Sequence, residues 1–377
     1  MITPYISRSL RLAITALSAL AGSLAAARDL VVDARGGTPY ATLSAAAAEV
    51  GPGDTLVIAK GSGPYRETLQ IKKSGTAAAP IIVEGNGETV TGFEPLVFTQ
   101  ENGVWLARLP KPFPLVIAHK GVRVLQDANA PADLFLAPIK LREDKLTIEL
   151  LPGGSPENWE VSVRECAVAI ANASFQTYRN LVATGATNDG FNLHVAGEGL
   201  IFENIVGANN LDEGFSAHGK VSCEIRGGFF FRNENGIANP NDVTVAKGIR
   251  LYDNLGWGLS LNNNSVATLV DVKSWNNDIA QYRFIHQASG TCNEVWAWAP
   301  TWKNRRYRSY TDSATTGNKP SALSNYAATP LPGTWPTGPK VAPETMPLPA
   351  NPLPPAPTAQ QVLQAGRDAA TTVTAAR

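Results

Sequence analysis

Two similar seven-residue segments near the middle of the chain carry side chains that are well suited to catalysis. Residues 188–194 read NDGFNLH, and residues 212–218 read DEGFSAH. In each segment a carboxylic acid precedes a glycine, and a histidine follows that glycine by four positions. Neighbouring carboxyl groups can act as general acid, general base or nucleophile, and their oxygen atoms can also bind a cation. The repeat therefore predicts both a structural period and a candidate site.

The glycine of this repeat recurs along the chain. Gly190, Gly214, Gly236 and Gly258 are spaced by 24, 22 and 22 residues. A period of this length is typical of a solenoid, in which each repeat forms one coil that stacks on the previous one. Alignment of the coils on this glycine predicts an inward column of apolar side chains, namely Phe191, Phe215, Ile237 and Leu259.

The same alignment places acidic residues in two neighbouring columns. One column contains Asn188, Asp212 and Glu234, and the other contains Asp189, Glu213, Asn235 and Trp257. Because adjacent coils of a parallel sheet are about 4.8 Å apart, four carboxyl groups should crowd one turn region. Such groups repel one another and raise some of their pKa values unless a proton, a cation or another partner stabilises them.

In a first interpretation, Asp189 and Glu213 form the acid pair of a glycosidase. One carboxyl group is then a protonated general acid and the other a nucleophile or base. A separation of one coil is close to the roughly 5–5.5 Å of retaining enzymes and below the roughly 6.5–9.5 Å of inverting ones. Asp212 is a further catalytic candidate. Strand alternation directs His194 and His218 outward, where they can assist proton transfer or bind sugar hydroxyls.

Two other interpretations of the acids remain open. The acids and asparagines can bind Ca²⁺, as expected for a polysaccharide lyase that abstracts a proton from a uronate. The candidate bases for that reaction are Lys220, Arg250, Lys273 and Arg283. Alternatively, Asp-Gly and Asn-Gly pairs simply form the turns of the coils and cap backbone amides there. The two histidines alone do not complete a metal site and would need Asp189 or Glu213 as a third ligand, so the sequence leaves a metal site unassigned.

We expect substrate-binding side chains around the acids. Trp257 lies two coils beyond Glu213 in the aligned column, and an indole ring offers a flat apolar face to a pyranose. Arg283 and His286 follow the last coil and are positioned to bind an acidic sugar. The remaining substrate-binding candidates are Asn192, Glu234 and Asn235.

The N-terminal part of the mature chain contains an ordered series of short motifs. These are YATLSAA at 40–46, GPGDTLVI at 51–58, YRETL at 65–69, SGTAAAPIIV at 74–83 and VTG at 90–92. They resemble the opening of secreted right-handed parallel β-helix proteins of the pectate-lyase superfamily. The resemblance implies an all-β solenoid and a carbohydrate-active protein, without assigning a family.

The local sequence pattern agrees with this architecture. Residues 42–50 are rich in alanine and predict a helix that covers the open end of the solenoid. Short strands are predicted at 55–58, 68–71 and 81–84, separated by glycine, serine and proline. Residues 93–162 alternate like an antiparallel meander, which predicts a β-rich insertion. The predicted β-helix domain spans 28–320, and residues 321–377 are a proline-rich extension with a short C-terminal helix.

Composition limits the compartment and the partners. Residues 1–27 resemble a secretory signal peptide with cleavage near Ala27, which predicts a secreted or periplasmic protein. The chain has 32 basic and 32 acidic residues, which gives no indication of nucleic-acid binding. No later segment is long and apolar enough for a membrane span. The three cysteines, Cys166, Cys223 and Cys292, allow at most one disulfide.

These observations lead to one expected function and two alternatives. We expect a monomeric enzyme that hydrolyses glycosidic bonds of a polysaccharide or oligosaccharide with a pair of carboxyl groups. The alternatives are a Ca²⁺-assisted lyase acting by β-elimination on a uronate polymer and a non-catalytic glycan-binding β-helix. The sequence does not specify the sugar, the linkage, or endo as opposed to exo action.

Overall fold

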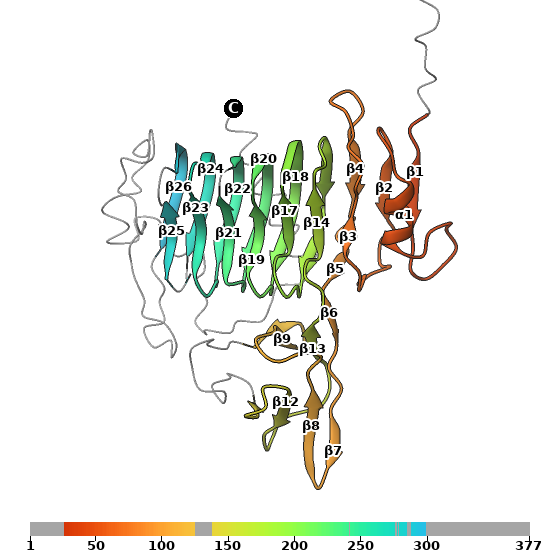
Figure 1. Cartoon of the computed structure of the whole chain (residues 1–377), viewed down its shortest axis with the longest axis vertical. Helices are drawn as coiled ribbons and strands as arrows, with labels where there is room; N and C mark the ends of the chain where they lie inside the picture. Colours follow the sequence, from red (N-terminus) through yellow and green to blue (C-terminus); the bar gives the residue numbers. More distant parts are fainter. Residues whose placement is uncertain are drawn as a thin grey trace, which may run out of the picture.

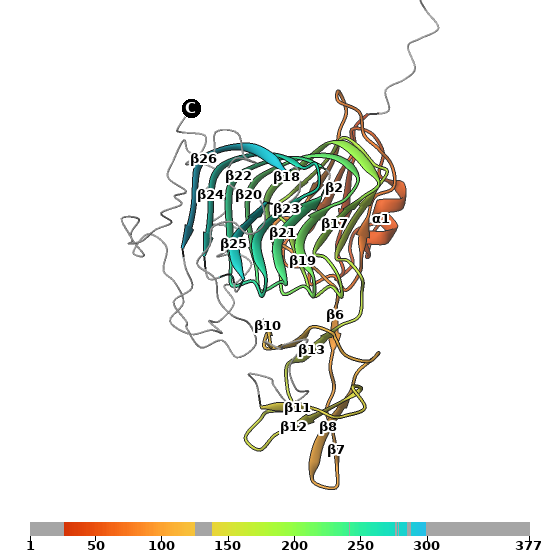
Figure 2. The same cartoon turned by 60° about the vertical axis from the view of Figure 1, so that its left-hand side comes forward.

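The chain folds as a right-handed parallel β-helix from which an antiparallel region projects (Figures 1 and 2). A computed structural model describes residues 26–124, 138–240, 242–275, 277, 279–284 and 288–298. The predictions for residues 1–25 and 321–377, which include most of the signal peptide and the C-terminal extension, lie outside these residues. Among the described residues, no helix is long and apolar enough to cross a membrane.

The first coil is covered by the helix α1 (Leu43–Glu49), as the sequence predicts. Thr42 is its N-cap, and the Thr42 side chain accepts a hydrogen bond from the backbone N–H of Ala45. Leu43, Ala46 and Ala47 are buried against the solenoid core. The helix therefore contributes its apolar face to the core, and Figure 1 shows it beside β1 and β2 at the end of the stack.

One face of the solenoid is a large parallel sheet, here called sheet A. Its strands, in spatial order, are β1 (Asp29–Val32), β2 (Thr55–Ile58), β4 (Ile81–Glu84), β15 (Gln176–Arg179), β18 (Ala196–Ala208), β20 (Lys220–Phe231), β22 (Val243–Tyr252), β24 (Val266–Trp275) and β26 (Ser289–Trp298). The short strands β5 (Thr89–Thr91) and β16 (Val182–Thr184) extend it, and β16 pairs with both β5 and β18.

The opposite face is a second parallel sheet, here called sheet B. In spatial order it contains β3 (Leu69–Gln70), β14 (Val168–Ala171), β17 (Phe191–His194), β19 (Glu213–Ala217), β21 (Asn235–Pro240), β23 (Trp257–Asn262) and β25 (Ala280–Phe284). The chain passes from sheet A to sheet B and back in each coil. Sheet B carries the repeated segments on which the sequence was aligned.

The antiparallel strand pairs lie between Phe93 and Ser162. One sheet contains β6 (Phe93–Pro95), β9 (Ile117–His119), β10 (Val122–Arg123) and β13 (Trp159–Ser162). The other contains β7 (Thr99–Glu101), β8 (Val104–Arg108), β11 (Ile139–Leu141) and β12 (Thr147–Leu150). This region has its own apolar core, and both views show it projecting from the coil stack. We call it the insertion.

The inward column of sheet B has the predicted register. Phe191 pairs with Phe215, which pairs with Ile237, and the column continues through Leu259 to Tyr282. Each of these side chains is at most 1% exposed. Burial of large apolar side chains stabilises each by about 1.5–3 kcal/mol, so this column holds the coils together.

A ladder of buried asparagines connects the turns that lead from sheet A to sheet B. It consists of Asn210, Asn233, Asn254 and Asn277, each 0% exposed. The backbone N–H groups of Asn210, Asn233 and Asn254 donate to the side-chain oxygen of the next asparagine at 3.0–3.1 Å. The residue before each of these three has a left-handed φ of 56°. The asparagine-rich turns thus stack as the sequence suggested.

The glycines that mark the period are required for packing against this asparagine ladder. None of the four has a left-handed φ. A Cβ atom at Gly190 would lie 2.6 Å from Asn210 Nδ2, and one at Gly214 would lie 2.7 Å from Asn233 Nδ2. These glycines therefore do not supply the left-handed backbone of the turn, which comes from residues earlier in the turn.

Candidate functional site

The turn edge of sheet B brings the predicted acids together on successive coils. Asp189 lies just before β17, and Glu213 is the first residue of β19. The register continues from Glu213 to Asn235 and places Trp257 one coil further. Carboxyl oxygens of Asp189, Asp212 and Glu213 lie within 4.8 Å of one another. We call these three residues the acid cluster.

Asp189 lies in the interior of the acid cluster and is only 1% exposed. Its Oδ2 accepts hydrogen bonds from Asn192 Nδ2 at 2.6 Å and from Ser216 Oγ at 2.5 Å. Its Oδ1 accepts one from the backbone N–H of Glu213 at 3.1 Å. These donors fix the orientation of the carboxyl group and suit an ionised carboxylate.

Glu213 is 9% exposed, and its environment opposes ionisation. Burial raises the pKa of Glu213 far above its ordinary range, and the charges of Asp189 and Asp212 raise it further. Asn235 Nδ2 donates to Glu213 Oε1 at 2.9 Å, which opposes the rise only in part. The environment of Glu213 therefore favours its protonated form.

Asp212 is half-buried beside Glu213. Burial raises the pKa of Asp212, and the charges of Asp189 and Glu234 act in the same direction. A hydrogen bond with Glu213 and the charge of Arg123 lower it. Asp212 thus interacts with the carboxyl groups of Asp189, Glu213 and Glu234, as the sequence alignment predicted.

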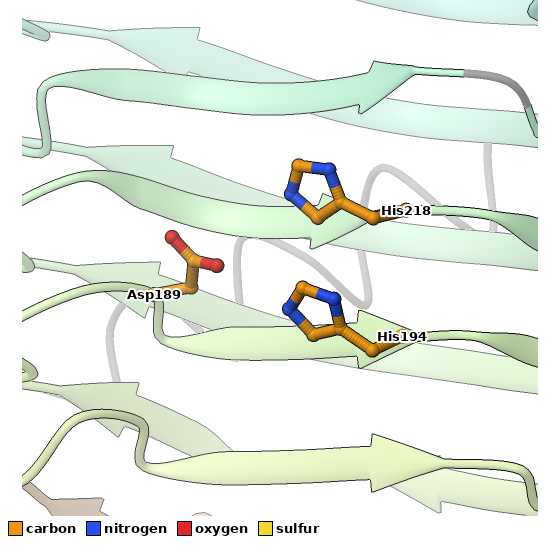
Figure 3. A group of neighbouring side chains, drawn as sticks. All are labelled: Asp189, His194 and His218. Carbon is orange, nitrogen blue, oxygen red and sulfur yellow. The ribbon is translucent and has the colours of Figure 1, made fainter.

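His194 and His218 stack on each other beside Asp189 (Figure 3). Their ring centroids are 4.9 Å apart, and the rings are inclined by 13°. Both are half-buried on the outer side of sheet B, because Phe191 and Leu193 occupy the inward positions of β17. Burial lowers the pKa of His218, and the neighbouring His194 lowers it further.

Trp257 and Arg283 form a second pair further along sheet B. The Arg283 guanidinium carbon lies 4.1 Å from the centroid of the Trp257 ring, a cation–π contact. Burial lowers the pKa of Arg283. Within the part of the chain that the structure describes, neither an acidic partner for Arg283 nor a hydrogen-bond acceptor for Trp257 Nε1 is present. His286, the other predicted member, lies outside the described residues.

The candidate bases for the lyase interpretation lie on different sheets. Lys220, Arg250 and Lys273 belong to sheet A. Arg250 and Lys273 both form ion pairs with Asp271, at 2.9 and 3.2 Å. Only Arg283, on β25, shares sheet B with the acid cluster.

The sequence alignment missed three neighbours of the acids. Ser216 binds Asp189 directly, and its outward position on β19 was a usable signal. Cys166 precedes Asp189 by one coil, but no marker glycine follows it. Burial and the charge of Asp189 raise the pKa of Cys166 to about 12. Among the described residues Cys166 and Cys223 are free, and neither forms a disulfide.

The third missed neighbour, Arg123, comes from the insertion. It is 2% exposed, and its guanidinium donates to the carbonyl oxygens of Asn210 and Arg232. These atoms belong to the turns that carry the asparagine ladder, so β10 lies directly against the edge of the site. No sequence signal connected residue 123 with a turn 86 residues later.

The solved structures to which this chain is similar share little sequence with it. No protein-family model matches the sequence, and no curated protein matches it. The structure of XylC with xylose is 14% identical, with a TM-score of 0.48 over 72% of this chain and 64% of that one. An alginate lyase from Paenibacillus sp. str. FPU-7 is 9% identical, with a TM-score of 0.39 over 77% and 99%. The pectate lyase Pel9A is 14% identical, with a TM-score of 0.38 over 78% and 80%.

The present chain thus spans less than two thirds of the XylC chain. The strand pairing itself defines the class, a right-handed parallel β-helix with an acid cluster on sheet B.

Proposed function

We propose that this protein is a carbohydrate-active enzyme that hydrolyses glycosidic bonds, with Glu213 as general acid and Asp189 as nucleophile. The observation that carries the proposal is the spacing of the acid cluster, whose carboxyl oxygens lie within 4.8 Å of one another. A pair this close fits the retaining geometry of roughly 5–5.5 Å and leaves no room for the water that an inverting pair holds.

The environments of the two carboxyl groups differ in the way that this reaction requires. Glu213 retains a proton that it can donate to the leaving oxygen, because burial opposes its ionisation. Asp189 accepts three hydrogen bonds, which orient its carboxyl group. Because Asp189 is 1% exposed, a sugar reaches it only when a neighbouring side chain moves aside. Asp212, which is half-buried, is the alternative nucleophile.

The Trp257–Arg283 pair supports a polysaccharide substrate with an acidic sugar. Trp257 is two coils from Glu213, a distance of roughly 10 Å at the spacing of parallel strands. A sugar ring can stack on the indole while its carboxylate pairs with the Arg283 guanidinium. The same pair would also suit a polysaccharide lyase, which is the second candidate function, with Ca²⁺ held by the acids.

The test is an assay of the full chain on a panel of neutral and uronate-containing glycans. Hydrolysis releases reducing ends alone, whereas elimination also gives an unsaturated product that absorbs in the ultraviolet. We expect reducing ends without that absorbance, and we expect Asp189→Asn and Glu213→Gln each to reduce the rate by roughly 10²–10⁴-fold.

Glu203→Gln is the matched control, because Glu203 pairs with Arg226 on sheet A, away from the acid cluster. It should retain the wild-type rate. Full activity in both Asp189→Asn and Glu213→Gln would refute the glycosidase assignment. Loss of activity on addition of a chelator, together with an unsaturated product, would support the lyase instead.

A further inference from the structure

Asp189 also belongs to a second group of potential ligands, together with His194 and His218. One carboxyl oxygen and one nitrogen from each ring lie within 4.8 Å of one another. Figure 3 shows the two imidazoles on adjacent coils, each with a ring nitrogen on the side nearer the Asp189 carboxylate. Two imidazoles and one carboxylate are a ligand set that the acid pair alone does not provide.

The two imidazoles make no hydrogen bond or ion pair with any residue that the structure describes. The rings stack on each other, with centroids 4.9 Å apart. Here the ring nitrogens of two neighbouring, half-buried residues are available for a shared ligand.

Hydrogen bonds from other residues fix the orientation of the Asp189 carboxyl group beside the two imidazoles. Asn192 and Ser216 both donate to Asp189 Oδ2, and the backbone of Glu213 donates to Oδ1. Hydrogen bonds of this kind orient carboxylate ligands around metal ions and strengthen binding. The column of stacked histidines contains only these two residues. Ala171 occupies the position one coil before His194, and the register of β19 with β21 continues to place Pro240 one coil after His218.

We propose that Asp189, His194 and His218 form a binding site for a first-row divalent transition-metal ion such as Zn²⁺. Nitrogen ligands favour such ions over Ca²⁺ and Mg²⁺, which prefer oxygen. With metal–ligand bonds of about 2.0–2.2 Å, the ligand atoms must approach to roughly 3.3 Å, which requires the two half-buried imidazoles to rotate toward Asp189. Three protein ligands leave a fourth position open to solvent.

A bound ion affects the acid pair, because both use Asp189. The ion withdraws the Asp189 carboxylate from catalysis, so Zn²⁺ should inhibit hydrolysis and a chelator should restore it. This consequence rests on the proposed function, whereas metal binding itself does not.

The test is a titration of the full chain with Co²⁺, followed by visible absorption and by competition with Zn²⁺. We expect one saturable site in the wild type. His194→Ala, His218→Ala and Asp189→Asn should each weaken binding by at least about 100-fold, since loss of a supporting hydrogen bond alone costs 10–100-fold. Circular dichroism and urea unfolding establish that each variant is folded.

His119→Gln is the matched control, because it removes a histidine of the insertion that stacks on Trp159. It should bind Co²⁺ as the wild type does. Absence of saturable binding in the wild type, or wild-type affinity in both folded alanine variants, would overturn the proposal. Metal binding without cleavage of any glycan would refute the proposed hydrolase and leave the metal site standing, and cleavage without metal binding would do the reverse.

Discussion

The asparagine ladder and the acid cluster occupy opposite ends of the same turns, yet they stack in different ways. In the ladder, Asn233 is 0% exposed, and its side-chain oxygen and nitrogen both have partners at 3.0–3.2 Å. In the cluster, Glu213 and Asp212 are acids whose burial raises their pKa values. A neutral amide is both donor and acceptor, so a column of amides satisfies itself, whereas a column of carboxylates does not.

The two sets of side chains in one turn therefore differ in their role. Stacked amides stabilise the coils, and any solenoid benefits from them. Stacked acids reduce stability at neutral pH, and natural proteins retain such groups mainly where they are used. The contrast therefore favours a functional role for the acids over the interpretation that they only cap turns.

Introduction of one acid into the asparagine ladder should have the largest effect on stability. Asn233→Asp places a carboxylate oxygen against the carbonyl oxygen of Gly207 and the side-chain oxygen of Asn254. We expect the free energy of unfolding at pH 7 to fall by about 3–5 kcal/mol, because a buried charge loses hydration without a partner. Urea unfolding measures this change. A loss below about 1 kcal/mol would show that the ladder does not hold the coils.

A smaller effect of opposite sign is expected for Asp212→Asn. The substitution removes a charge that raises the pKa of Glu213, and Asp212 itself is half-buried. The free energy of unfolding at pH 8 should rise by about 1 kcal/mol, since one pKa unit corresponds to about 1.4 kcal/mol. The thermal unfolding midpoint is a suitable measurement. A decrease in this midpoint would show that the charge of Asp212 does not oppose folding.

Much of the stacking of side chains in sheet B was predictable from the sequence. The period of 22–24 residues predicted the register of Phe191 and Phe215 and the approach of Asp189 to Glu213, and the alanine-rich composition of residues 42–50 predicted the helix after Thr42. Periodic spacing specifies which residues stack, because each coil repeats the previous one. It does not specify contacts from outside the repeat, which is why Arg123 was missed.

Three further aspects depended on packing that a sequence pattern does not contain. The alignment treated the marker glycines as turn residues, but Gly190 and Gly214 are excluded from bearing a Cβ by the asparagine side chains. It also left Cys166 out of the aligned columns, because its coil lacks the glycine used for alignment. The degree of burial of Asp189, which decides how a substrate reaches it, follows only from the three-dimensional arrangement.

The central claim is that the acid cluster holds Glu213 protonated at the expense of stability at higher pH. The most direct test is the difference in free energy of unfolding between Glu213→Gln and the wild type, measured with urea from pH 4 to pH 8. The folded-state pKa of Glu213 is raised, so the wild type loses stability as the pH rises above about 4.3, the ordinary glutamate value. Glutamine imitates the protonated acid and avoids this loss. We expect a small difference at pH 4 that grows to roughly 2 kcal/mol or more in favour of the variant at pH 8, and a difference independent of pH would show that Glu213 is not held protonated.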